Sequence, residues 1–170
     1  MNADELRALQ APLKARYKED PNAGLVTLRA KGLLSDTTVA CKVDTGRAIV
    51  EAGLHPATGG DGLAVCSGDM LLEALAGCAG VTMKAVATAI GVEIKEGKVL
   101  VEGDLDFRGT LGVSRDAPVG FKAIRLAFEL DTTATEEQLA SLLKLTERYC
   151  VVFQTLKTTP ALSVSSKTKA

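Results

Sequence analysis

The feature that most constrains this chain is a long apolar segment that begins near Gly68 and ends at Gly91. Ser67 offers an N-cap, Asp69 adds negative charge to the first turn, and Gly91 stands where a glycine commonly ends a helix. The polar residues and glycines of this predicted helix fall on one stripe: Glu73, Gly77, Gly80, Lys84 and Thr88. The rest of its circumference is almost wholly apolar, so we expect a central helix that is packed on several sides.

Strands are predicted before and after this helix in the sequence. Their β-branched or alternating patterns are typical of half-buried antiparallel strands. They cover residues 25–34, 37–43, 47–52, 92–110 and 121–131, with a shorter strand near 162–164. The first two flank Ser35-Asp36 and should form a hairpin. The Gly-rich stretch 53–62 needs unusual backbone angles, so we expect an ordered loop there.

Three further helices are predicted. Residues 3–17 carry apolar side chains at helical spacing, and 151–157 form a short helix or turn. Thr135 and Gln138 make a capping-box pattern ahead of a helix that runs to about Tyr149. No repeat or second domain is visible, so the prediction is one α+β domain over 1–170, in which residues 1–20 are an N-terminal helical extension.

Charge and hydropathy exclude several classes of protein. Twenty basic residues stand against twenty-one acidic ones, a formal net charge of -1 that gives no broad electrostatic footprint for nucleic acid or an anionic membrane. The segment 1–19 lacks the apolar stretch of a signal peptide, and Glu73 and Lys84 interrupt the longest apolar run. We therefore expect a cytoplasmic protein, in which the four cysteines are not a structural disulfide framework.

Cysteine is the one strongly nucleophilic residue type whose placement stands out. In general a free cysteine is a small apolar filler. If helix intervenes, Cys66 lies about 18 Å from Cys78, whereas a disulfide needs Cα atoms within roughly 7 Å. Cys150 stands at the junction of two predicted helices that could pack against the long helix that carries Cys78. Cys41, in a predicted strand, remains a possible partner of Cys78.

A reactive thiol in the middle of a helix needs a cation that favours its thiolate. Lowering the pKa of Cys78 from about 8.5 to about 6 requires roughly 3.4 kcal/mol. Arg29, Arg47 and Arg148 are the candidates, although each is otherwise a solvated surface charge. The lone His55 has no second histidine at metal-ligand spacing, so we expect it to brace its loop, and we expect no metal site and no cofactor.

Two motifs resemble those of the OsmC/Ohr family. Gly59-Gly60-Asp61-Gly62 followed by Ser67-Gly68-Asp69-Met70-Leu71-Leu72-Glu73-Ala74-Leu75-Ala76-Gly77-Cys78 is similar to that family's GG loop and PxELLLAALxxC helix. The second hallmark, a cysteine near the end of the chain, is matched by Glu147-Arg148-Tyr149-Cys150-Val151-Val152-Phe153-Gln154-Thr155-Leu156. The order of predicted elements from Leu25 to Val164 also resembles the family.

The resemblance implies an intertwined homodimer in which central helices lie between curved, mainly antiparallel sheets. It also implies a thiol peroxidase for organic hydroperoxides, in which Cys78 is the peroxidatic thiolate and Cys150 resolves its sulfenic acid as a disulfide. A dithiol, of lipoyl type in the best-known members, would then reduce the disulfide.

Three departures place the chain in an outlying branch of the family. Ser67 replaces the usual proline, Gly68 replaces the glutamate that orients the essential arginine in the classical peroxidases, and Val151 replaces a proline. Asp69 or Glu73 could take over the orienting role. A second hypothesis is therefore a dimeric binding or redox-sensing module without efficient peroxidase activity, and a third is that all four thiols are core filler.

Overall fold

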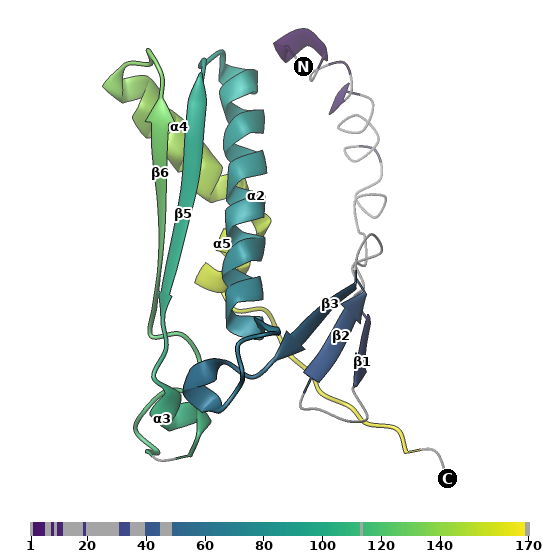
Figure 1. The fold of residues 1–170 in the computed structure, drawn as a ribbon. Coiled ribbons are helices and arrows are strands. Elements are labelled where there is room, and N and C mark those ends of the chain that lie inside the picture. The colour runs from purple at the N-terminus through teal and green to yellow at the C-terminus, as the bar shows by residue number, and fades with distance from the viewer. Residues whose placement is uncertain are drawn as a thin grey trace.

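The structure, a computed structural model, describes residues 2–5, 8, 10–11, 19, 31–34, 40–44, 49–112 and 114–168. Most of the predicted helix over 3–17, and the candidate residues Arg29 and Arg47, lie outside the described residues. The described part confirms the α+β class and the mainly antiparallel strands (Figure 1).

The long helix α2 spans Ser67–Ile90 and ends on Gly91, whose φ of 73° is left-handed and suits a glycine. Cys66, not Ser67, is the N-cap, and it makes no side-chain capping hydrogen bond. A stripe at spacing of four is buried: Leu75, Ala79, Met83 and Ala87. This confirms the predicted helix, but within the described chain it is buried along this one stripe and not on several sides.

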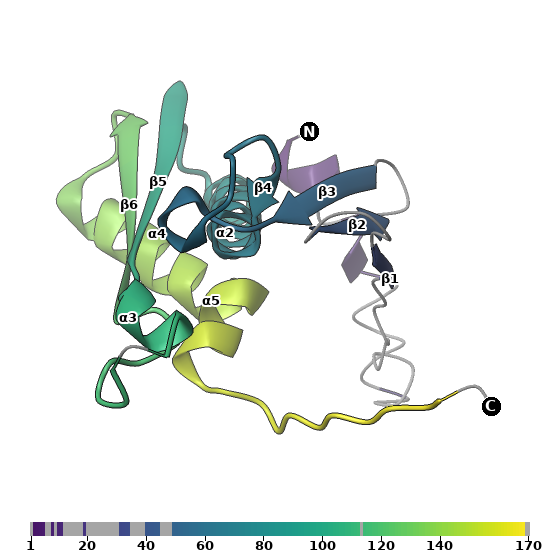
Figure 2. The same ribbon diagram turned by 60° about the horizontal axis from the view of Figure 1, so that its bottom comes forward.

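Helix α2 lies between the β5–β6 hairpin on one side and strands β1 to β3 on the other, in both views (Figures 1 and 2). By length and composition alone α2 is also apolar enough to cross a membrane. The core helix of a soluble protein meets the same criteria, and α2 packs against β5 (Glu96–Asp104), α4 (Glu136–Tyr149) and α5 (Val151–Lys157).

Strand β5 pairs antiparallel with β6 (Ala123–Asp131), from Glu96 opposite Asp131 to Asp104 opposite Ala123. Alternate residues of β6 face inward, as the periodicity predicts. The predicted strand over 92–110 is too long, because Asp106 accepts a hydrogen bond from the backbone N–H of Arg108 and thereby caps a short helix, α3 (Phe107–Thr110).

Two buried clusters hold the helices on the hairpin. The first contains Met83, Ala87, Val92 and Leu142, and the second contains Leu75, Ala79 and Cys150. Helix α4 begins with the predicted capping box, in which Gln138 N–H donates to Thr135 Oγ1 and Thr135 N–H donates to Gln138 Oε1. The capping signal and the apolar spacing thus predicted this helix correctly.

The predicted hairpin before α2 is confirmed by β1 (Lys31–Leu34) and β2 (Ala40–Asp44), which are antiparallel, and the third strand by β3 (Ile49–Gly53). A two-residue strand, β4 (Val65–Cys66), pairs parallel with β3 and was not predicted. Between them lies the 3-10 helix η2 (Pro56–Thr58) and the loop glycines. Gly59 has a φ of 93°, and a Cβ on Gly60 would lie 1.8 Å from the carbonyl oxygen of Leu54, so both positions require glycine.

The predicted strand near 162–164 is wrong for the described chain. After α5, residues 158–168 form no helix or strand and extend away from the other elements (Figure 2). Leu162 is 82% exposed and Val164 fully exposed. Their alternation resembles a strand, but no described strand pairs with them.

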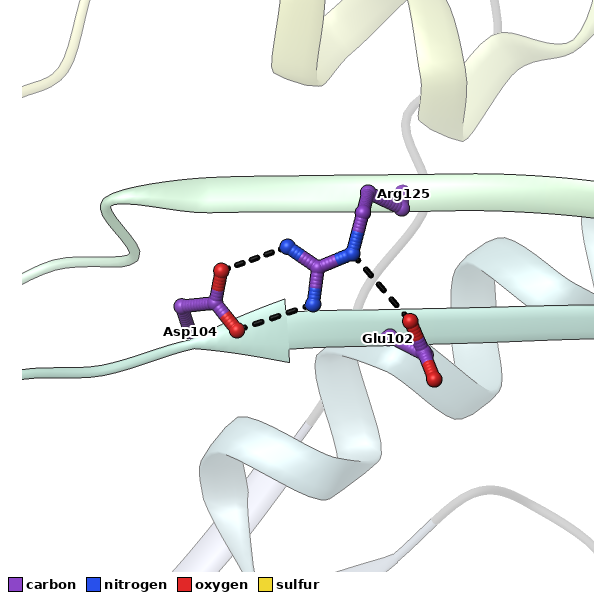
Figure 3. A network of polar contacts seen from close by, with 3 residues as sticks. All are labelled: Glu102, Asp104 and Arg125. Atoms are coloured by element: carbon purple, nitrogen blue, oxygen red, sulfur yellow. Dashed lines mark hydrogen bonds and ion pairs between the residues drawn. The ribbon is translucent and has the colours of Figure 1, made fainter.

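The outer face of the β5–β6 hairpin is polar. Arg125 on β6 reaches across to β5, where Nη2 donates to Asp104 Oδ1 at 2.8 Å and Nε donates to Glu102 Oε2 at 3.1 Å (Figure 3). All three side chains are at least half exposed. Ion pairs in such a position are screened by solvent, so this network orders a surface and does not hold the core.

Candidate active site

The structure brings Cys78 and Cys150 into contact. Cys78 lies in the middle of α2, and Cys150 is the residue between α4 and α5. Cys150 belongs to the buried cluster with Leu75 and Ala79, and Cys78 packs against that cluster. Cys78 is partly exposed, whereas Cys150 is fully buried, so an incoming molecule reaches Cys78 first.

The position of Cys150 is fixed by both helices that it joins. Its N–H donates to the carbonyl oxygen of Thr146 at the end of α4. Its own carbonyl oxygen accepts a hydrogen bond from Gln154 N–H in α5. The backbone around the thiol is therefore held in place before any chemistry occurs.

Burial raises the pKa of the Cys78 thiol, but hydrogen bonds outweigh this effect and lower the pKa below its ordinary value. The donors are the backbone N–H of Val152, the thiol of Cys150, the backbone N–H of Val151 and the hydroxyl of Thr82. Val151 and Val152 open α5, whose first turn has no capping side chain, so their N–H groups are free to face a sulfur. A negative charge on Cys78 is stabilised there.

The pKa of Cys150 moves in the opposite direction. Burial raises it, and a thiolate on the neighbouring Cys78 raises it further, because two negative charges would then lie side by side. The pair therefore ionises at Cys78, while Cys150 keeps its proton. This gives one nucleophilic sulfur and one protonated sulfur in contact with each other.

The predicted activating or orienting residues that the structure describes, Arg148, Asp69 and Glu73, are not among the groups that act on Cys78. Arg148 is exposed, with its guanidinium 5.6 Å from the ring centre of Tyr149, and no arginine of the described residues is among the groups that shift the pKa of Cys78. The side chains of Asp69 and Glu73 are exposed on α2 and make no hydrogen bond or ion pair with other described residues. Arg29 and Arg47 lie outside the described part of the chain.

The other two cysteines are apart from the pair. Cys66 caps the start of α2, with unbroken helix between it and Cys78, as the sequence predicted. Cys41 lies on β2 opposite Ala52, and its side chain is outside the described part of the structure. Cys66 is not among the groups that act on Cys78 or Cys150.

His55 braces its loop, as predicted. Its Nδ1 accepts a hydrogen bond from Ala57 N–H at 3.0 Å, and its ring stacks on Phe107 with 4.8 Å between ring centres. In the described part of the chain, no three His, Cys, Asp or Glu side chains gather where they could hold a metal ion.

Sequence reasoning missed the groups that stabilise the Cys78 thiolate. It looked for a cation because a mid-helix thiol is far from its own helix N-terminus, but the N-terminus of a second helix, α5, lies beside it. No sequence signal pairs these two helices. Thr82 could have been found, since it follows Cys78 by four residues and so lies on the same face of α2.

The model of a protein family described as OsmC-like protein matches residues 59–165. The chain belongs to the OsmC-like protein family. The match begins at the GG loop and includes both Cys78 and Cys150. No curated protein matches the sequence.

Solved structures agree with OsmC-like membership. The OsmC-like protein of Mycoplasma pneumoniae superposes with a TM-score of 0.66 at 16% identity, over 79% of this chain and 89% of that one. An organic hydroperoxide resistance protein from Elizabethkingia anophelis gives 0.63 at 13% identity, over 79% and 91%. An OsmC-like protein of unknown function from Vibrio cholerae gives 0.63 at 14% identity, over 79% and 96%. At these identities the likeness shows the OsmC fold.

Proposed function

We propose that this OsmC-like protein is a thiol peroxidase that reduces organic hydroperoxides through a Cys78–Cys150 disulfide cycle. The observation that carries the proposal is the contact between a partly exposed thiol whose pKa is lowered and a buried thiol whose pKa is raised. A peroxidatic cysteine must be a thiolate, and a resolving cysteine must wait within reach of it. Membership of a family that includes organic hydroperoxide resistance proteins supports the same assignment.

In the first step the Cys78 thiolate attacks the distal oxygen of the hydroperoxide. An S–O bond forms, the O–O bond breaks, and the leaving alkoxide takes a proton and departs as the alcohol. Cys78 is oxidised to a sulfenic acid, and the hydroperoxide is reduced. The donors from Val151, Val152 and Thr82 hold the thiolate at the position where this attack begins.

In the second step Cys150 attacks the sulfur of the Cys78 sulfenic acid. An S–S bond forms, the S–O bond breaks, and the hydroxide leaves as water with the proton that the Cys150 thiol carried. A dithiol, of which a lipoyl group is one example, then reduces the disulfide by two thiol exchange reactions and is itself oxidised to a disulfide.

We also propose that the working unit is a homodimer. The resemblance to the OsmC/Ohr family implies this assembly, and Val81, on the side of α2 opposite its buried stripe, is 73% exposed. Contact with a second copy would remove this apolar side chain from water. Light scattering after gel filtration tests this: the parent should run at twice the chain mass, and Val81→Glu should run as a monomer.

The peroxidase proposal is tested by intact mass and free-thiol count after one equivalent of cumene hydroperoxide is added to the reduced protein. The parent should lose two thiols rapidly. Cys150→Ser should accumulate a sulfenic acid that a dimedone probe traps, and Cys78→Ser should not react. Cys66→Ser is the matched control, because Cys66 is also a free, partly exposed thiol and should be dispensable.

A second candidate is a binding or redox-sensing module with the same fold. Gly68 favours it, because the glutamate that the resemblance places there is absent and neither Asp69 nor Glu73 pairs with an arginine among the described residues. Parent protein that keeps all its thiols while the peroxide persists would favour this candidate and exclude the peroxidase.

A further inference from the structure

The core of the described chain contains a polar residue, Thr146 on α4, which is only 1% exposed. Its hydroxyl donates a hydrogen bond to Sδ of Met83 on α2, with 3.7 Å between the two atoms. A buried hydroxyl needs a partner, but the sulfur of a thioether is a weak acceptor. A valine of the same shape would fill this space without a polar group to satisfy. The free energy of unfolding therefore gains little from this hydroxyl.

A second helical threonine, Thr88 on α2, shows the usual arrangement. Its Oγ1 donates at 2.8 Å to the carbonyl oxygen of Lys84, four residues earlier in the same helix. The hydroxyl of Thr146 instead crosses to another helix, to a residue 63 positions away in the sequence. It therefore joins α4 to α2.

This hydrogen bond lies about one helical turn from both sulfurs of the cysteine pair. Thr146 precedes Cys150 by four residues, and its carbonyl oxygen accepts the N–H of Cys150 at 3.0 Å. Met83 directly follows Thr82, whose hydroxyl donates to the sulfur of Cys78. A single side-chain contact thus connects the backbone of Cys150 with the turn of α2 that binds Cys78.

The apolar contacts between α4 and α2 do not by themselves fix how far one helix is shifted along the other. Leu142 packs in the same buried cluster as Met83, but burial of apolar surface is non-directional. A hydrogen bond is directional, and a disulfide forms only within a narrow range of distances and angles. Fixing the register of packed helices is the best-attested use of a buried polar group.

We propose that Thr146 is a positioning residue, whose hydroxyl fixes the register of α4 on α2 and thereby holds the sulfur of Cys150 where it can bond to that of Cys78. This inference rests on the proposed disulfide cycle for its place in the reaction. The effect on disulfide formation itself does not depend on a peroxide as the oxidant.

The first test measures the equilibrium between the reduced protein with one oxidised glutathione and the Cys78–Cys150 disulfide with two reduced glutathiones. Thr146→Val should lower this equilibrium constant by about threefold, the order expected for one weak hydrogen bond, because the two thiols are then held together less of the time. Thr146→Ser keeps the hydroxyl and should restore the parent value. Thr88→Val is the matched control: it removes a hydroxyl bonded within its own helix and should leave the constant unchanged.

Urea unfolding of the reduced proteins separates positioning from stability. Thr146→Val should be at least as stable as the parent, because a methyl group replaces a buried hydroxyl. Thr146→Ser should be less stable, because it loses a buried methyl group. The more stable variant should therefore form the weaker disulfide. An unchanged equilibrium constant in Thr146→Val, or constants that follow stability in both variants, would overturn the inference.

A single turnover with cumene hydroperoxide distinguishes this inference from the peroxidase proposal. Thr146→Val should leave more sulfenic acid for dimedone to trap than the parent does, because Cys150 attacks it more slowly. If no protein reacts with the peroxide, the peroxidase proposal fails, and a weaker disulfide of Thr146→Val in glutathione still supports the role of Thr146. If the peroxide is reduced and the glutathione equilibrium of Thr146→Val equals that of the parent, the peroxidase proposal stands and this inference fails.

Discussion

The backbone N–H of Val151, the first residue of α5, faces the sulfur of Cys78 on α2 and stabilises its thiolate. Where this chain has Val151, the classical peroxidases that it resembles have proline, which carries no N–H. The departure therefore adds a hydrogen-bond donor at the sulfur. Among the described residues, the groups that lower the pKa of Cys78 are hydrogen-bond donors of this kind and include no arginine.

Val151→Pro should slow the reaction of Cys78 without disturbing the fold. Proline suits the first position of a helix, and Cys150 before it already has an extended backbone, with φ -73° and ψ 107°. Loss of one hydrogen bond to a charged sulfur should lower the rate of alkylation at neutral pH by about fivefold or more. Val151→Ala, which keeps the N–H, should react like the parent. Equal rates for all three proteins would show that the N–H of Val151 does not stabilise the Cys78 thiolate.

Cys78 should stay reactive at a pH where an ordinary thiol, with a pKa of about 8.5, is protonated. Because its pKa is lowered, its thiolate persists as the pH falls below that value and is lost only through the lower pKa. Alkylation rates followed by peptide mass spectrometry against pH measure the midpoint. Cys150→Ala removes a donor and should move this midpoint upward, whereas Cys150→Ser keeps a donor and should move it less.

Leu142→Ala should destabilise the protein by about 2–5 kcal/mol, the usual range for a large buried side chain. Leu142 is fully buried in the cluster with Met83 and Ala87, so its removal leaves a cavity between α4 and α2. Urea unfolding measures the loss. The neighbouring Leu143 is 45% exposed, and Leu143→Ala should change the free energy of unfolding much less; a similar loss for both would contradict this account of the core.

Arg125→Gln should change the titration of Asp104 and leave the cysteine chemistry unchanged. The hydrogen bonds from Arg125 lower the pKa of Asp104, so any stability that they give is present above the ordinary pKa of about 3.9 and is lost as the pH falls through the lowered one. In the variant this pKa should rise toward its ordinary value, which carboxyl NMR measures. Lys98→Gln, on the same outer face, is the control and should leave Asp104 unchanged.

The regular elements were predictable because their signals are local. The capping box of Thr135 and Gln138, the left-handed Gly91 and the alternation along β6 each depend on near neighbours in sequence, and each prediction is confirmed. Where a local signal needed a distant partner it failed: the alternation of Leu162 and Val164 predicted a strand, but no described strand lies beside it.

The site was predictable only in part. Cys78 and Cys150 could be chosen because both lie in the motifs that resemble the OsmC/Ohr family. Helix geometry alone excluded Cys66 as a partner of Cys78 but left Cys41 open. The donors from Val151 and Val152 could not be found, because they are backbone groups that become available only when α5 packs against α2. No particular residue type in the sequence marks where a backbone donor will be available.

Cys150 both ends α4 and begins α5, while Cys78 lies in the middle of α2. A bond between their sulfurs would close a covalent loop of roughly 70 residues and restrict the unfolded chain, a gain worth roughly 4 kcal/mol in the chain-entropy account. The free energy of unfolding would then be higher after exposure to an oxidant, because the oxidised chain has fewer unfolded conformations. Reduction of the disulfide by a dithiol would return the free energy of unfolding to its lower value.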